Sequence, residues 1–284
     1  VVVGYYKHKD VIEKIKKFLD VARAVDFSKN LNVAMFGSNM REVAVTDGDR
    51  VESQIKFGWN VNYYGIGDLV ALVNAVTDEE LDAKMAEYNE LYVMNTDNID
   101  AVKEQAKYEI ALDKFMQAGG FAAYTDTFQD LHGLKQLPGL AIQRLMEKGY
   151  GFGAEGDWKV AAMVRLMKIM TEGMKDAKGT SMLEDYTYNL VPGKEGILQA
   201  HMLEICPSIA DGQIGIKCKP LSMGEREDPA RLVFTSKEGE GIACSLIDLG
   251  HRFRLIINEV DCIKTEKEMP SLPTATNFWV PRPD

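Results

Sequence analysis

The sequence predicts an α/β protein, with a layered central domain built on a mainly parallel sheet over residues 1–178 and an incomplete, mostly antiparallel, barrel-like β domain over residues 179–284. Two observations carry this prediction. In the first part, short apolar runs alternate with apolar residues at three- and four-residue spacing, which is typical of strands alternating with amphipathic helices. In the second part, β-prone runs are separated by Gly, Pro, Asp and Glu, as in antiparallel sheets and barrels.

The first strand–helix cycles occupy about 75 residues. Val1–Val3 is expected to be a buried strand that enters a turn, and the helix after it has an apolar stripe made of Val11, Ile12, Ile15, Phe18, Leu19, Ala22 and Val25. Residues 31–36 form a short apolar run that Gly37 ends, so we expect a buried strand whose C-terminal loop could hold a ligand. A second strand is predicted at 61–64 and a helix at 68–76.

The next helices carry clear boundary signals. Thr77 is followed three residues later by Glu80, which is the pattern of a capping box, so a helix should begin there and run to about Asn89. A longer helix is predicted over residues 99–117, a strand over 121–124, and a helix over 140–148. From Trp158 to Met174 the spacing is again helical, and its methionines are interpreted as core residues.

Residues 151–156 spell G-x-G-x-x-G, the pattern of a dinucleotide-binding loop. The segment follows a predicted helix and carries Glu155 where a phosphate would have to approach, so we interpret it as a loop of another kind. Beyond Gly179, strands are predicted at 232–235, 242–246 and 253–258.

Composition and charge exclude several classes of function. The chain has 33 Lys+Arg and 43 Asp+Glu, hence a formal charge of −10, and no concentrated basic patch, which argues against nucleic-acid binding. No apolar run approaches the roughly 20 residues that span a bilayer, and no signal peptide is evident, so a cytoplasmic protein without membrane association is expected. The four cysteines lack metal or disulfide spacing and are expected to be ordinary thiols.

Three residues stand out as candidates for chemistry. Glu155 lies in a glycine-rich loop just before a helix, where a ligand has backbone room, although a simple helix N-terminal charge explains it as well. Glu184 lies beside apolar and aromatic residues where a strand is expected to begin. An edge-strand charge or a salt bridge explains its position as well. His201 lies in an apolar run, where a lone histidine is usually a half-buried structural residue. Their separations match no metal-binding motif, so only the fold could bring them together.

Several long motifs identify a family. The chain resembles L-arabinose isomerases over essentially all of its 284 residues, and family members extend further at both ends. We expect the chain to be a central and partial C-terminal portion of such a protein. The resemblance rests on residues 36–46 (FGSNMREVAVT), 130–139 (DLHGLKQLPG), 155–159 (EGDWK), 184–188 (EDYTY), 201–204 (HMLE) and 227–232 (EDPARL), in this order.

The resemblance implies a cofactor, a pocket and an assembly. The family's Mn²⁺ ligands fall on Glu155, Glu184 and His201, while a fourth, a histidine, belongs to a segment downstream of this chain. The resemblance also implies a homo-oligomer, a hexamer in the family, in which a neighbouring subunit's N-terminal domain packs at the active site. The residues that it implies for the sugar pocket are Met40, Phe128, Met202 and Met223.

The implied reaction converts L-arabinose to L-ribulose through an enediol, with a possible side activity on D-galactose. Such a reaction needs a base and a means of stabilising negative charge on sugar oxygens. The hypothesis is that Glu155 and Glu184 combine metal binding with acid/base catalysis, while His201 holds the metal. Two alternatives stay open: a catalytically silent fragment that binds metal or sugar weakly or serves in assembly, and a metal-free glycosidase that uses the two glutamates.

Overall fold

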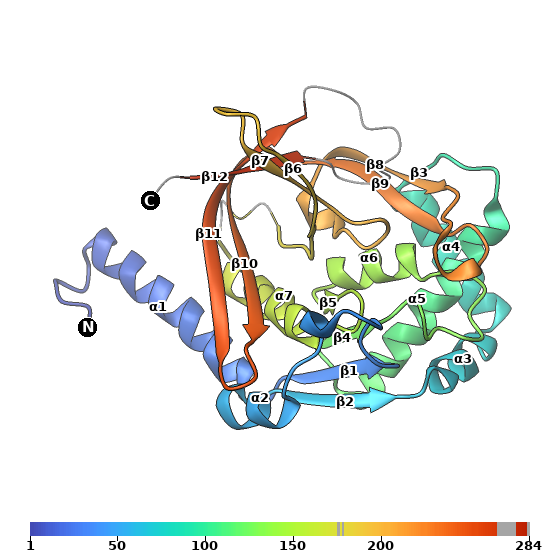
Figure 1. Cartoon of the computed structure of the whole chain (residues 1–284), viewed down its shortest axis with the longest axis horizontal. Helices are drawn as coiled ribbons and strands as arrows, with labels where there is room; N and C mark the ends of the chain where they lie inside the picture. Colours follow the sequence, from blue (N-terminus) through green and yellow to red (C-terminus); the bar gives the residue numbers. More distant parts are fainter. Residues whose placement is uncertain (175–176, 178, 266–276, 283–284) are drawn as a thin grey trace.

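A four-stranded parallel sheet forms the centre of the first half of the chain. In a computed structural model, described for residues 1–174, 177, 179–265 and 277–282, its strand order is β2-β1-β4-β5 (Figure 1). The strands are β1 (Asn32–Phe36), β2 (Asn60–Tyr64), β4 (Ala123–Asp126) and β5 (Gly151–Gly153). Because all of them run in the same direction, their carboxyl ends meet at one edge of the sheet. The predicted parallel sheet is therefore confirmed.

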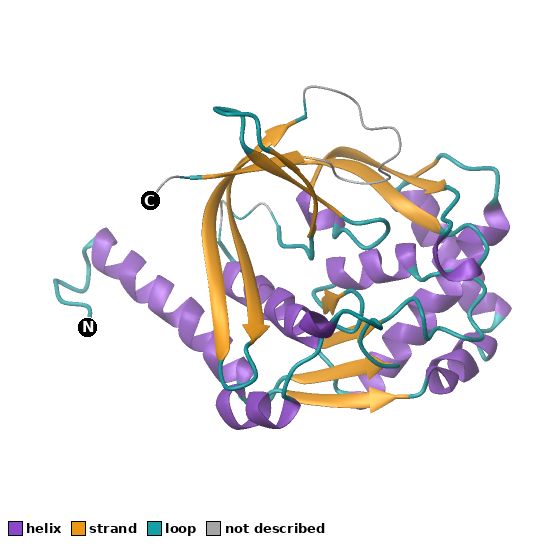
Figure 2. Ribbon diagram, viewed as in Figure 1, coloured by secondary structure: helices purple, strands orange, loops and turns teal. Residues whose placement is uncertain are grey.

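Helices cover both faces of this sheet, as expected for a parallel sheet (Figure 2). Successive residues of β1 point to opposite faces. Val33 and Met35 pack in one core cluster with residues of α7, whereas Ala34 and Phe36 pack in another with residues of α3, α5 and α6. The helices are α1 (Lys9–Ser28), α2 (Arg50–Phe57), α3 (Ile66–Asn74), α4 (Asp78–Leu91), α5 (Ile99–Gly119), α6 (Gly139–Glu147) and α7 (Trp158–Thr171).

The predicted helix boundaries depend on caps that the structure contains. The Thr77 hydroxyl accepts a hydrogen bond from the Glu80 backbone N–H at 3.3 Å, and the Glu80 carboxylate accepts one from the Thr77 N–H at 3.1 Å. This is the reciprocal capping box predicted for α4. At α7, the Asp157 carboxylate accepts from the N–H groups of Lys159 and Val160.

The second half is rich in antiparallel strands, as predicted. A five-stranded antiparallel sheet has the order β10-β11-β12-β7-β6, and a smaller sheet has the order β3-β8-β9. Within the described residues both sheets are open at their edges, so the barrel-like region is not a closed barrel. The strands are β3 (Val93–Met94), β6 (Glu184–Asn189), β7 (Gly196–Ala200), β8 (Ala210–Cys218), β9 (Ala230–Ser236), β10 (Gly239–Asp248), β11 (Phe253–Lys264) and β12 (Asn277–Pro281). The domain boundary predicted at residue 178 lies outside the described residues.

Three local predictions are corrected. Val1–Val3 is exposed and does not form a strand, because it pairs with no sheet. The segment expected to be a loop begins with the strand β5, which pairs with β4, so only residues 154–157 form a loop before α7. The apolar stripe of α1 is largely exposed, with Phe18 68% exposed, because α1 packs on α7 through other residues such as Arg23.

The expectation that the cysteines are ordinary thiols agrees with the structure. All four cysteines are free, and Cys206 and Cys262 are buried. Among the residues that the structure describes, no helix is both long enough and apolar enough to cross a membrane.

Candidate functional site

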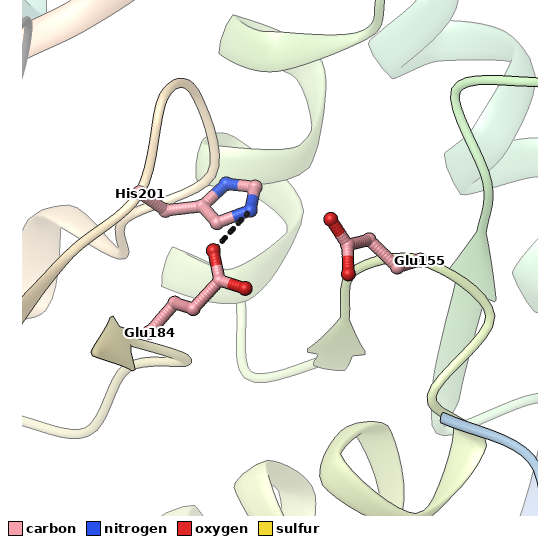
Figure 3. A group of neighbouring side chains, drawn as sticks. All are labelled: Glu155, Glu184 and His201. Atoms are coloured by element: carbon pink, nitrogen blue, oxygen red, sulfur yellow. Dashed lines mark ion pairs between the residues drawn. The ribbon is translucent and has the colours of Figure 1, made fainter. Parts of the chain in front are cut away.

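The candidate site lies where the two halves of the chain meet. Glu155 comes from the loop between β5 and α7, at the carboxyl edge of the parallel sheet. Glu184 is the first residue of β6, and His201 directly follows β7. The antiparallel register pairs Glu184 with Ala200, which brings His201 beside it. Figure 3 shows the three side chains converging from these separate elements.

The three side chains form a compact donor cluster. Each offers one ligand atom, and these atoms all lie within 4.8 Å of one another. The His201 Nε2 lies 3.6 Å from a Glu184 carboxylate oxygen. On the other side of the ring, Nδ1 lies 2.5 Å from the Glu204 carboxylate, which fixes the orientation of the imidazole. The Nε2 atom is therefore directed at the two glutamates.

The site is electrostatically unbalanced because several carboxylates share it. Burial raises the pKa of Glu155, and the neighbouring Glu184 carboxylate raises it further. Burial lowers the pKa of His201, but Glu204, Glu184 and Glu155 outweigh this effect, so its net pKa is raised. A bound cation would relieve the repulsion between the carboxylates.

Backbone contacts hold Glu155 in an unusual conformation. Its φ is 62°, in the left-handed region that non-glycine residues seldom adopt. The Glu155 carbonyl accepts a hydrogen bond from the Met40 N–H at 2.8 Å, and the next N–H, that of Gly156, donates to the Asp126 carbonyl at 2.8 Å. A Cβ at Gly156 would lie only 2.4 Å from the Asn39 Cα, so this loop packs directly on backbone. The surrounding structure thus fixes the strained residue that carries the carboxylate.

A buried lysine anchors the loop that contacts Glu155. Lys159 on α7 is fully buried, and its Nζ donates to the carbonyls of Val45, Thr46 and Asp47 at 3.1, 2.9 and 2.6 Å. It also lies 3.2 Å from the Asp157 carboxylate. The loop after β1 is thereby tied to the first turn of α7, next to the Glu155 loop.

Comparison with known proteins identifies the family. Residues 32–173 match the model of the L-arabinose isomerase central domain, and residues 179–284 match that of the L-arabinose isomerase C-terminal domain. The chain belongs to the L-arabinose isomerase family. The resemblance predicted from the sequence is therefore confirmed.

Individual L-arabinose isomerases are similar along the whole chain. The enzyme of Geobacillus stearothermophilus is 55% identical over 289 residues, that of Clostridium beijerinckii 53% over 284, and that of Bacillus subtilis (strain 168) 51% over 289. Each alignment covers 100% of this chain but only 57–58% of the relative. The chain thus spans a little over half the length of these L-arabinose isomerases.

A cavity beside the donor cluster contains most of the side chains predicted for the sugar pocket. Phe128, Met202 and Met223 line it together with Glu155, Glu184 and His201. Met40 does not line it and instead contacts the site through its backbone N–H. The remaining wall is mostly apolar, and its apolar members include Leu131, Leu137, Pro138, Leu203 and Leu221.

Sequence reasoning missed three polar residues of this cavity: Asp126, Tyr186 and Glu204. Burial and the Glu204 carboxylate raise the pKa of Asp126 to about 8, against a lowering effect of His201. Burial likewise raises the pKa of Tyr186. Asp126 ends a parallel strand and Glu204 follows His201 by three residues. Both positions are signals that could have singled these residues out.

The donor cluster fits a divalent cation. Two carboxylates and one imidazole are the oxygen and nitrogen ligands that Mn²⁺ accepts, and the imidazole has the carboxylate support that metal-binding histidines usually have. Three protein donors leave coordination positions free for substrate oxygens or another ligand. The ligand role of Glu155, Glu184 and His201 stays a prediction.

Proposed function

We propose that the protein carrying this chain is a metal-dependent isomerase that converts L-arabinose to L-ribulose, with Glu155, Glu184 and His201 as Mn²⁺ ligands. The convergence of these three donors in a chain of this family is the observation that supports it most directly. When bound, the metal would supply Lewis-acid polarisation of the oxygens on the two reacting sugar carbons. The family match favours this reaction over the glycosidase alternative.

The proton transfers fall to the two glutamates. Aldose–ketose isomerisation through an enediol moves a proton from C2 to C1, and protons also move between the two sugar oxygens. The Glu155 carboxylate meets Glu184 and His201 with ligand atoms within 4.8 Å, so it stands beside the proposed position of the reacting carbons and would serve the first transfer. Glu184, on the opposite side of the cluster, would serve the second transfer.

Other residues orient the groups and exclude water. Glu204 holds the His201 ring so that Nε2 faces the cluster. Phe128, Met202 and the neighbouring leucines provide an apolar wall, which strengthens electrostatic interactions at the reacting carbons. The same pocket is proposed to admit D-galactose as a secondary substrate, because its arrangement at the reacting carbons is similar.

The isolated 284-residue chain is proposed to be much less active than the complete protein. It contains three of the ligands that the family resemblance implies and 57–58% of the length of its relatives. The alternative of a silent fragment that binds metal weakly therefore applies to this chain alone. The homo-oligomer, a hexamer by resemblance, stays a prediction.

The test is a calorimetric Mn²⁺ titration with L-arabinose turnover followed in parallel, on this chain and on the full-length protein. We expect binding and turnover in the full-length protein, and weaker binding without turnover in the chain alone. Glu155→Gln in the full-length protein should abolish isomerisation, whereas Glu90→Gln, an exposed glutamate on α4, should not change it. Retained turnover in Glu155→Gln, or no response to Mn²⁺ in either protein, would show that the assignment is wrong.

A further inference from the structure

Asp126 places a buried carboxylate in the cavity without a protein partner. It is the last residue of β4, its side chain lines the cavity, and the residue is only 7% exposed. Its carbonyl accepts the Gly156 N–H, which fixes the backbone next to the Glu155 loop. In the described part of the chain, no hydrogen bond or ion pair reaches its carboxylate.

Of the three buried carboxylates among the described residues, Glu109 and Glu204 have protein partners and Asp126 has none. Glu109 is a comparably buried carboxylate, and it contacts the Tyr88 hydroxyl at 2.6 Å, Lys148 Nζ at 2.8 Å and Lys84 Nζ at 3.1 Å. Burying a carboxylate without such partners is unfavourable, and proteins satisfy nearly all buried polar groups. A carboxylate that lacks protein partners but faces a cavity is therefore expected to meet a polar group of a ligand.

The residues around Asp126 indicate which kind of polar ligand group its carboxyl group would meet. The charged neighbours of Asp126 are Glu204 and His201, of which Glu204 is already bonded to the His201 ring. The Asp126 carboxylate does not belong to the three-residue donor cluster. The remaining wall is mostly apolar, so few side chains are available to bind the hydroxyls of a polyol.

We propose that Asp126 is a substrate-binding residue whose carboxyl group hydrogen-bonds a sugar hydroxyl beyond the two reacting carbons. This inference rests on the proposed function and adds a residue that selects the sugar. With the reacting end of the substrate at Glu155, Glu184 and His201 as proposed, a hydroxyl further along the carbon chain can reach Asp126, because one cavity is lined by all four residues. The hydroxyl supplies the partner that the protein does not.

The test is a thermodynamic cycle between enzyme and substrate in the full-length protein. Turnover of L-arabinose and of its 3-, 4- and 5-deoxy analogues is measured for the wild type and for Asp126→Ala. In the wild type, loss of the bonded hydroxyl should lower kcat/KM by roughly 10- to 100-fold, the range for leaving a buried polar group without its hydrogen-bond partner. In Asp126→Ala, kcat/KM for the same analogue should be less than about threefold below kcat/KM for L-arabinose, because the carboxyl group that binds the hydroxyl is already gone.

Folding and metal binding are measured on the same variant. Asp126→Ala should keep the wild-type melting temperature or exceed it, because it removes a carboxylate that no protein group stabilises. The calorimetric Kd for Mn²⁺ should stay within about twofold of the wild-type value. If Asp126→Ala does not fold, Asp126→Leu supplies the same cycle with the cavity filled by apolar atoms.

Asp113→Asn is the matched control. It alters a carboxylate on α5 that is paired with Lys148 at 2.8 Å and lies outside the cavity. Its kcat/KM values for all four sugars should match those of the wild type. A change in this control equal to that in Asp126→Ala would overturn a specific role of Asp126.

Each other outcome also decides the inference. If Asp126→Ala lowers kcat/KM by the same factor relative to the wild type for every sugar, the residue shapes the pocket without binding a hydroxyl. A weakened Mn²⁺ affinity would show that it acts on the metal site, and a lowered melting temperature in both Asp126→Ala and Asp126→Leu would assign it a structural role. All three results overturn the proposal. If the wild type does not turn over L-arabinose at all, it is the proposed function that fails.

Discussion

Replacing Lys159 by Met should destabilise the protein more than almost any other single change on α7. The Nζ atom is fully buried and donates to three backbone carbonyls at 2.6–3.1 Å, while the Asp157 carboxylate lies 3.2 Å away. Methionine keeps most of the buried aliphatic volume but supplies no donor. Three carbonyls would therefore lose their donor, and the half-buried Asp157 carboxylate would lose its charge partner but keep its backbone N–H donors.

The expected loss of unfolding free energy follows from these contacts. Three charge-assisted hydrogen bonds at about 1.5–3 kcal/mol each give an upper sum of about 5–9 kcal/mol. The carbonyls can move towards water or other donors, and the apolar burial of Met offsets part of the loss. Removing one partner of a buried charged pair typically costs about 3–5 kcal/mol, and we expect Lys159→Met to fall in this range.

Urea unfolding followed by circular dichroism and tryptophan fluorescence measures this loss. Trp158, next to the substituted residue, packs edge-on against Trp59 and reports on the same region. The double variant Lys159→Met with Asp157→Asn should recover part of the loss, because asparagine leaves no unpaired charge and still caps the helix. Lys56→Met is the exposed control, since its pair with Glu52 is worth about 1 kcal/mol at most.

Two results would refute this reasoning. One is a loss below about 1 kcal/mol for Lys159→Met, which would mean that the three carbonyls find other donors. The other is a double variant that is no more stable than the single one, which would mean that Asp157 does not depend on the lysine. Because the lysine ties residues 45–47 to α7, Mn²⁺ affinity should also fall in Lys159→Met.

Three further predictions concern the site. Glu204→Gln should weaken Mn²⁺ binding about 10- to 100-fold by calorimetry, because His201 loses the carboxylate that orients it, and an unchanged Kd would contradict this. Gly156→Ala should lower the free energy of unfolding in urea by more than about 1 kcal/mol, and by more than Gly173→Ala does. Both glycines have a positive φ, but of the two only Gly156 packs against backbone. Equal losses in the two variants would contradict the steric argument. Without metal, the free energy of unfolding should fall by up to about 1.4 kcal/mol per pH unit as pH rises from 3.8 towards about 8. The reason is that folded Asp126 retains a proton that the unfolded chain has released. Asp126→Asn should flatten this slope, and an unchanged slope would exclude Asp126 as its source.

Local patterns determined the order and type of most elements. The three- and four-residue spacing in α5 and the capping box at Thr77 depend only on neighbours along the chain, so they could be recognised without a fold. The apolar stripe of α1 shows the limit of this reasoning. Periodicity predicts that a face is apolar, but only the tertiary structure shows that this face does not pack on the sheet.

The sequence by itself determined the parallel sheet, the antiparallel second half, and, through its motifs, the family and the three candidate ligands. Only the tertiary structure decided that Glu155, Glu184 and His201 meet, because contacts between residues 17 and 29 positions apart depend on strand register and on how two sheets approach each other. Asp126 emerged for the same reason. Its burial without a partner is a property of every element around the cavity, and no local pattern encodes it.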